Sequence, residues 1–421
     1  MMAKSRQASG VLSGQSPDAA PLRQTPAVLA PVKAPWLRPG VVVHEPTVPV
    51  DGLLAEFALT LRDRGFHVAG AVQRNNACGE AMGQGCAQQI DFFDLGERIN
   101  FSADRSSSIK LLRKAMREDA ELVVISRFAA FEAAAQNVNA TMSGPSQGMP
   151  ILTSIAGRCV QKWQDAIKPD GAMISPSLRA LWQWWGPENL YRDLELGVAD
   201  TEVKRIVAGS RWIMVESEHG AGLAYLPRSP RDLAPQFARL AQQGLRSLAQ
   251  LTASWDPVEM ALGLAAINAH YNRFDSQGAS GNGTQSFRHC AGQVVVIGAF
   301  PGLQGMYPES SVIEADPRPG EYPLVAMDAL LPGCGAVVVN SSALVNRSLP
   351  RILRLARDAR IALIGPATPL TPRLFDYGLD VLGGFVVRDV DGLALAIHAG
   401  AAPKEFVRFG SYIHLRSGGE E

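Results

Sequence analysis

The sequence predicts an α/β protein in which two open, mostly parallel sheets are separated by a smaller α+β unit. The chain has 421 residues, enough for two or three domains. Short β-branched runs alternate with amphipathic segments in residues 39–187 and again in residues 286–403, which is typical of parallel sheets. Between them, residues 188–285 run from strand-like to helical patterns. Residues 1–38, which hold five prolines, and residues 404–421 are predicted to be tails, the first disordered.

Composition excludes several classes of protein. The 40 basic residues balance the 40 acidic ones, so a general binder of nucleic acid is not expected. No apolar stretch approaches the roughly 18 residues that span a bilayer. Five cysteines are too few for a disulfide scaffold, and no signal-peptide core is present, so the expected compartment is the cytoplasm.

The first segment, residues 39–187, opens with the buried strand Val41–His44. A helix follows, with Asp51 as its expected N-cap, and then strands at 66–73, 90–95, 121–126 and 149–155, with helices at 109–117 and 159–167. The loop after the first strand, Glu45–Asp51, lacks both a glycine-rich turn and Gly-Lys-Ser/Thr. It therefore has no Walker A motif, and ATP hydrolysis is not expected there.

Several stretches of this segment carry a resemblance. Residues 51–73 ("DGLLAEFALTLRDRGFHVAGAVQ"), Asp94-Leu95, residues 121–139 ("ELVVISRFAAFEAAAQNVN") and "PILTSI" resemble an uncharacterised bacterial domain similar to ATP-binding proteins of molybdate transporters. The resemblance implies a P-loop-like domain that lacks Walker A. It departs from the family pattern at Arg127–Glu132, where Ala129 replaces a glycine, and at residues 102–110.

The middle segment, residues 188–285, reads as strands within 203–226, then helices at 233–251 and 257–271, then a linker from Asp275. In residues 286–403, strands are expected at 293–297, 312–314, 336–340, 361–364 and 385–387, and helices at 350–359 and 391–399. Polar residues cluster where these strands end, and that edge of a parallel sheet is where ligands bind.

Four motifs in the last segment, "VVVIGAFPGL", "VIEADPRPGEYP", "AVVVNSSALVNRSLPRIL" and "IALIGPATPLTPRLFDYGLDVLGGFVV", closely resemble a family of unknown function described as "putative heavy-metal chelation". "GSRWIMVES" and "WDPVEMALGLAAINA" resemble its first domain. The resemblance implies an enolase N-terminal-like α+β domain (188–285), a Rossmann-like domain (286–403) and a ligand in the cleft between them. The ligand-binding residues it implies are Trp212, Glu259, Asn268, Gly298, Phe300, Glu314, Ser341, Ser342, Asn346, Gly365, Thr368 and Pro369.

Each candidate also has a structural interpretation. Glu314 could serve as a cap or form a salt bridge at a strand end, Ser341 and Ser342 could cap a helix, and Asn346 and Thr368 are common in turns. Cys78 and Cys86, in the loop "CGEAMGQGC", could bind a soft metal as two thiolates or be ordinary thiols in a flexible loop.

Three hypotheses for function remain open. The first is metal or metallocofactor handling, linked to molybdenum, with a metal ion, molybdate or a metal complex as the bound species. The second is an enzyme acting on a nucleotide-like or pterin-like molecule, although neither G-x-S-x-G nor H-E-x-x-H is present. The third is a non-catalytic accessory protein. We expect a small-molecule or metal ligand and neither nucleic acid nor membrane; a homo-oligomer, or a partner of the N-terminal domain, stays open.

Overall fold

A computed structural model describes residues 38–73, 90–95, 100–103, 120–126, 150–166, 171–227, 234–298, 300 and 303–418. Cys78 and Cys86, the expected helix at 109–117 and the Arg127–Glu132 segment lie outside these residues, as does nearly all of the expected N-terminal tail. The described residues form three sheets, with seven, three and eight strands. The α/β fold class expected from the sequence is confirmed.

The first sheet has the strand order β4-β3-β2-β5-β6-β1-β7. β1 is parallel to β6 and β7, and β5 is parallel to β2 and β6, whereas β3 is antiparallel to β2 and β4. Its strands are β1 (Gly40–His44), β2 (Val68–Gln73), β3 (Ile90–Asp94), β4 (Asn100–Ala103), β5 (Leu122–Ile125), β6 (Ile151–Ala156) and β7 (Ala172–Ile174).

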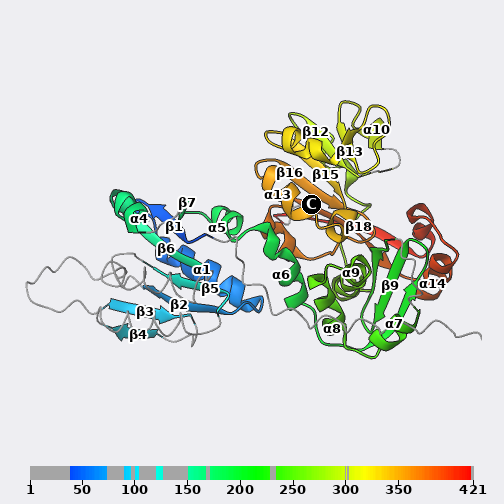
Figure 1. Cartoon of the computed structure of the whole chain (residues 1–421), viewed down its shortest axis with the longest axis horizontal. Helices are drawn as coiled ribbons and strands as arrows, with labels where there is room; N and C mark the ends of the chain where they lie inside the picture. The colour runs from blue at the N-terminus through cyan, green and yellow to red at the C-terminus, as the bar shows by residue number, and fades with distance from the viewer. Residues whose placement is uncertain are drawn as a thin grey trace, which may run out of the picture. The chain divides into compact units, whose positions relative to one another are not determined.

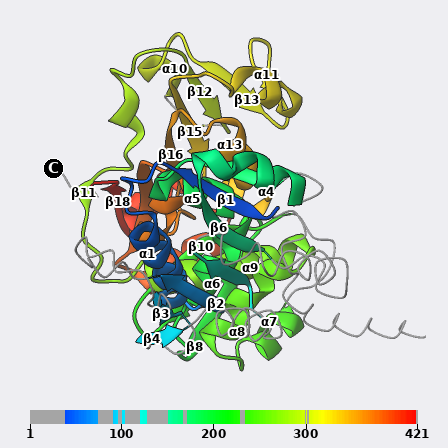
Figure 2. The same ribbon diagram turned by 90° about the vertical axis from the view of Figure 1, so that its left-hand side faces the viewer.

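Helix α1 (Val50–Asp63) lies beside this sheet (Figures 1 and 2). Its Leu54, Phe57 and Leu61 are fully buried in the hydrophobic core. Its N-cap is Pro49, so Asp51 lies in the first turn and not at the cap as expected. A carboxylate is favourable in either place because it faces the positive end of the helix dipole. After β6 come the 3-10 helix η1 (Gly157–Cys159) and α4 (Val160–Ala166).

The short helices after β7 carry a buried carboxylate, Asp193, with no exposed surface. It accepts hydrogen bonds from Arg64 (2.6 Å), Arg373 (2.6 Å) and the Tyr377 hydroxyl (3.0 Å). Two cations and a hydroxyl offset the cost of burying this charge. These helices are α5 (Leu178–Trp185), η2 (Pro187–Asn189) and α6 (Leu190–Leu196).

The second sheet is antiparallel, in the order β10-β9-β8, and is followed by helices. The long helix α9 covers it (Figure 1), and Gly222 of β10 is required there. A Cβ on Gly222 would lie 2.1 Å from the Ala269 nitrogen of α9. The helix expected over 233–251 is divided, because residues 241–244 lie between two helices. The elements are β8 (Val203–Ala208), β9 (Trp212–Ser217), β10 (Ala221–Tyr225), α7 (Ala234–Leu240), α8 (Leu245–Ala249), η3 (Gln250–Ala253) and α9 (Pro257–Tyr271).

The third sheet has the order β11-β18-β17-β16-β15-β12-β13-β14. The strands from β17 to β14 are parallel, and β18 is antiparallel to β17 and β11. The strands are β11 (Ala279–Ser280), β12 (Val294–Ile297), β13 (Ser311–Glu314), β14 (Tyr322–Pro323), β15 (Ala336–Asn340), β16 (Arg360–Ile364), β17 (Val381–Val387) and β18 (Gly410–Arg416). The helices are η4 (Thr284–Phe287), α10 (Leu303–Met306), η5 (Leu324–Ala326), α11 (Met327–Leu330), α12 (Ser342–Val345), α13 (Leu349–Leu355), η6 (Pro372–Tyr377), α14 (Val390–His398) and η7 (Pro403–Arg408).

Strand β18 differs from the expectation that residues 404–421 form a tail. It pairs with all seven residues of β17, and its Ile413 is buried. The expected linker also contributes a strand, because β11 pairs with the outer side of β18. Ile413 and Leu415, two residues apart, lie on one face of this strand, and Tyr412 lies on the other. Among the described helices, none has both the length and the apolar character needed to cross a bilayer.

Candidate functional site

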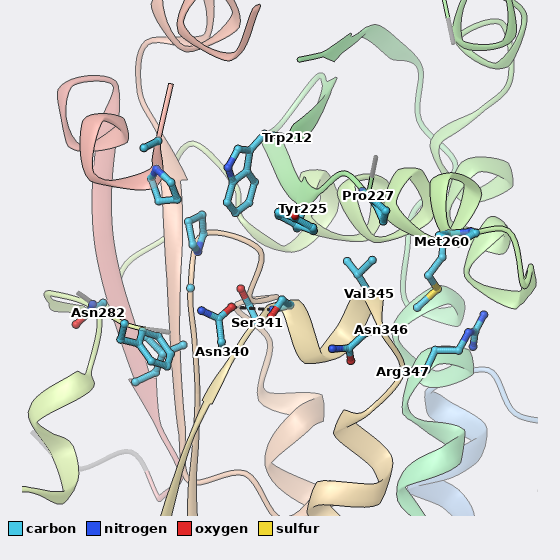
Figure 3. Close-up of a pocket in the computed structure, with 18 of the residues that line it drawn as sticks. Trp212, Tyr225, Pro227, Met260, Asn282, Asn340, Ser341, Val345, Asn346 and Arg347 are labelled. Carbon is cyan, nitrogen blue, oxygen red and sulfur yellow. Dashed lines mark hydrogen bonds between the residues drawn. The ribbon is translucent and has the colours of Figure 1, made fainter. Parts of the chain in front are cut away.

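A pocket of about 1080 Å³ lies between the second and third sheets and the helices packed on them. One wall comes from β9, β10 and the start of α9. The other comes from the ends of β13, β15 and β16, and from η7 and β18. Figure 3 shows Trp212 and Tyr225 on one side facing Asn340 and Ser341 on the other. The pocket therefore lies at the carboxyl edge of the parallel strands, which is the edge where a ligand is expected from the sequence.

The polar wall is fixed by hydrogen bonds at the strand ends. The Asn340 side chain accepts from the Ser342 amide (3.0 Å), and the Ser341 amide donates to the Ile364 carbonyl (2.8 Å). Gly365 has φ +146°, and a Cβ there would lie 2.2 Å from the Ser341 hydroxyl oxygen. Glycine is therefore required at this position, since a side chain would displace Ser341.

Aromatic rings form much of the opposite wall. Trp212 packs edge-on against Tyr225, with ring centroids 6.1 Å apart, and against Phe406 at 5.4 Å. Trp255, with 79% of its surface exposed, also lines the pocket. Tyr412 lines it from β18, and burial raises the pKa of its hydroxyl, which stays neutral and can donate a hydrogen bond.

The charged lining residues are Glu314, Arg347 and Lys404. Glu314 ends β13 and accepts a hydrogen bond from the Ala315 amide (3.1 Å). Burial lowers the pKa of Arg347. Lys404 is exposed on η7. The wall thus combines two cations and one carboxylate with hydroxyl and amide groups.

The structure brings many of the sequence-predicted residues together. Those that line the pocket are Trp212, Phe300, Glu314, Ser341, Ser342, Asn346 and Gly365.

Three other predicted residues, Asn268, Thr368 and Pro369, are buried and do not line the pocket. Asn268 is fully buried on α9 and donates to the carbonyls of Leu223 (2.8 Å) and Ala367 (3.0 Å). Thr368 is buried in the same loop as Ala367, as is Pro369. These contacts suit residues that position the Gly365–Leu370 loop more than residues that touch a ligand.

Two further predicted residues are also absent from the lining. Gly298, at φ +93°, lies under Asn340, and a Cβ on it would be 2.5 Å from the Asn340 Cβ. Glu259 is half-buried in the first turn of α9, between the lining residues Pro257 and Met260.

Several lining residues were not among the sequence candidates. Asn340 follows a predicted strand directly and could have been selected by the same rule as Ser341. Arg347 follows the candidate Asn346, and nothing in the sequence marks it further. The remaining ones reach the pocket from distant segments and include Tyr225, Trp255, Asn282, Lys404 and Tyr412.

Metal ligation by cysteine is not supported within the described residues. Cys159, Cys290 and Cys334 are free thiols, and none lines the pocket. Across the same residues, no group of three or more His, Cys, Asp and Glu side chains is placed to hold a metal ion. The interpretation of Cys78 and Cys86 as a metal site stays a prediction.

In the loop after β1, backbone amides donate hydrogen bonds to carbonyls of the same loop. The Val48 amide donates to the Glu45 carbonyl (3.1 Å), and the Val50 amide donates to the Val48 carbonyl (2.8 Å). A phosphate cradle needs such amides directed at the ligand. The geometry is therefore consistent with the missing Walker A sequence.

Comparison with known proteins covers both halves of the chain. A family described as "Protein of unknown function" matches residues 40–184. The chain is also 26% identical over 165 residues to "Molybdenum import ATP-binding protein ModC 2" of Bradyrhizobium diazoefficiens. That match covers 35% of this chain but only 18% of the relative.

Two solved structures of unknown function from the DUF364 family resemble the other half. One, from Desulfitobacterium hafniense, is 33% identical, covers 54% of this chain and 97% of its own, and has a TM-score of 0.49. The other, from Pyrococcus horikoshii, is 19% identical, covers 54% and 98%, and has a TM-score of 0.47. Two family models with the same description match residues 191–271 and 286–416. The C-terminal half of the chain therefore belongs to the family described as "putative heavy-metal chelation".

Proposed function

We propose that the chain handles metal, and that the pocket binds the metal as an anionic complex with a small organic ligand. The observation that carries this proposal is the lining chemistry. Hydroxyl, amide and aromatic groups surround one carboxylate, Glu314, and two cations, Arg347 and Lys404. A bare transition-metal ion prefers Cys, His or several carboxylates, whereas a complex brings most of its own ligands.

The size of the pocket supports the same conclusion. A volume of about 1080 Å³ lies just above the range for small-molecule sites, roughly 300–1,000 Å³. A single ion would leave most of it to water, while an organic complex could contact both walls. The aromatic wall formed by Trp212 and Tyr225 would cover the apolar part of such a ligand.

The molybdenum link is the finer part of the proposal. It rests on the resemblance of residues 40–184 to a domain like that of the Bradyrhizobium protein, whose name refers to molybdenum import. Molybdate is itself an oxyanion, so the hydroxyl and cationic groups of the pocket suit it better than they suit a cation.

The aromatic wall also favours a second candidate, an enzyme acting on a nucleotide-like or pterin-like molecule. A flat heterocycle could stack on Trp212 or Tyr225, with its polar edge toward Asn340 and Ser341. The thermal-unfolding experiment described next distinguishes this enzyme from a metal-handling protein.

The test is thermal unfolding of the full chain with sodium molybdate, nickel chloride, nickel citrate or ATP. A ligand at 100 times its Kd adds about 2.7 kcal/mol of stability, which raises Tm by several degrees. We expect nickel citrate or molybdate to raise Tm. Ser342→Phe, which fills the pocket, should abolish the shift, and Ser417→Phe, at an exposed position outside the pocket, should keep it. If only ATP raises Tm, the metal function is wrong and the second candidate replaces it.

A further inference from the structure

Arg347 is held in place by groups from another part of the chain. Its Nη2 donates hydrogen bonds to the Ser254 carbonyl (2.7 Å) and to the Thr252 carbonyl. The guanidinium also lies 4.8 Å from the ring centroid of Trp255 and 5.5 Å from that of Tyr191. Two carbonyls and two rings therefore fix the orientation of this cation at the wall of the pocket.

Two features of Arg347 are unfavourable for the stability of the folded chain. Arg347 has φ +59°, and among the described residues it is the one non-glycine residue with a positive φ. This conformation costs an L-residue about 1–2 kcal/mol. Within the described part of the chain, no carboxylate forms an ion pair with it, although it is partly buried. Backbone strain of this kind is concentrated at functional sites.

The guanidinium retains free hydrogen-bonding capacity. It has five N–H groups, of which the two on Nη2 face carbonyls. For the three on Nε and Nη1, the described residues provide no hydrogen-bond acceptor. An oxyanion would accept from the Nε–H or from Nη1 and would balance the charge.

We propose that Arg347 is an anion subsite of the pocket, which binds a carboxylate or phosphate group of the ligand. This inference rests on the proposed function for the place of the ligand, and it adds that the ligand has a terminal oxyanion. Trp255 and Tyr191 hold the guanidinium in place. Both bidentate edges of a guanidinium include Nη2, which donates to the two carbonyls, so the anion accepts a single charge-assisted hydrogen bond from the Nε–H or from Nη1. The metal-bearing part of the ligand then lies toward Asn340 and Glu314, which line the same pocket.

The test uses calorimetry on the full chain with three probes: metal-free sodium citrate, sodium phosphate and nickel citrate. We expect Arg347→Met to weaken citrate or phosphate binding about tenfold to a hundredfold, the usual effect of losing charge-assisted hydrogen bonds. Arg347→Lys keeps the charge, but one ammonium cannot donate to the two carbonyls and also reach the anion as the guanidinium does, so an intermediate loss is expected. Whichever metal-free anion depends more strongly on Arg347 identifies the group as carboxylate or phosphate.

Two variants separate binding from folding. Arg347→Gly suits the positive φ, so its urea midpoint should be no lower than that of Arg347→Met, while the affinity for the anion falls equally. Arg360 also lies over an aromatic ring, Phe287 at 4.9 Å, but outside the pocket. Arg360→Met is therefore the matched control and should leave all three affinities unchanged.

The outcomes distinguish this inference from the proposed function. If Arg347→Met binds all three probes as tightly as the wild type, or if the wild type binds none of them, the anion subsite is refuted. If nickel citrate binds both proteins equally and neither metal-free anion depends on Arg347, the metal function stands without the subsite. If the wild type binds citrate through Arg347 but nickel adds no affinity, the subsite stands and the metal function fails.

Discussion

Replacing Asn272 with alanine should loosen the contact between α9 and the third sheet. Asn272 follows α9 directly and has only 1% of its surface exposed. Its Nδ2 donates to the carbonyls of Thr368 (3.0 Å) and Phe385 (3.3 Å), and its Oδ1 accepts from the Leu370 amide (2.9 Å). One side chain thus ties the end of α9 to both the Gly365–Leu370 loop and β17.

The expected cost follows from these three bonds. Each contributes about 1 kcal/mol net, and the Leu370 amide would be left buried without an acceptor, so Asn272→Ala should lose about 3 kcal/mol of unfolding free energy. With an m-value near 3 kcal/mol/M, the urea midpoint would fall by about 1 M. Because Gly365 lies in the tethered loop and lines the pocket, ligand affinity should fall as well.

Urea unfolding followed by far-UV circular dichroism measures this change. Gln277, five residues on, is exposed and makes one long hydrogen bond (3.3 Å), so Gln277→Ala should change stability by less than about 0.5 kcal/mol. Asn272→Asp keeps the acceptor for Leu370 but places a charge against two carbonyl oxygens, so it should destabilise at least as much as Asn272→Ala. A midpoint for Asn272→Ala no lower than that of Gln277→Ala would refute this reasoning.

The sequence predicted the buried parts of the fold well because their signal is local. The runs Val41–His44 and Ala336–Asn340 each contain three consecutive valines and become parallel strands with a neighbour on either side. Once strands are parallel, their carboxyl ends share an edge, so Glu314, Ser341 and Gly365 could be placed together without knowing any contact.

The features that were not predicted from the sequence depend on contacts between segments that are distant along the chain. Nothing local shows that residues 410–416 pair with β17, and this pairing brings Tyr412 to the pocket. Asn272 meets partners about a hundred residues away, although its spacing of four from Asn268 would place both on one face of α9. For Arg347, no carboxylate among the residues that the structure describes forms an ion pair with it, and this is a property of the assembled pocket that no sequence pattern could reveal.

Two further predictions concern Gly298 and His270. Gly298→Ala should lower the urea midpoint, because φ +93° disfavours alanine by about 1–2 kcal/mol and the new Cβ would displace Asn340. Gly305→Ala, which has open space around the new Cβ, should leave the urea midpoint unchanged. Equal shifts of the urea midpoint in the two variants would contradict this explanation. For His270, burial lowers the pKa below 6.5, so the unfolded chain binds the proton more readily than the folded one. The stability contributed by neutral, half-buried His270 is fully present above about pH 6.5 and is lost as pH falls through the pKa of His270 in the folded chain. Unfolding free energies between pH 8 and pH 5 should therefore fall less steeply in His270→Gln than in the wild type. Parallel slopes for the two proteins would show that His270 is not a source of acid sensitivity.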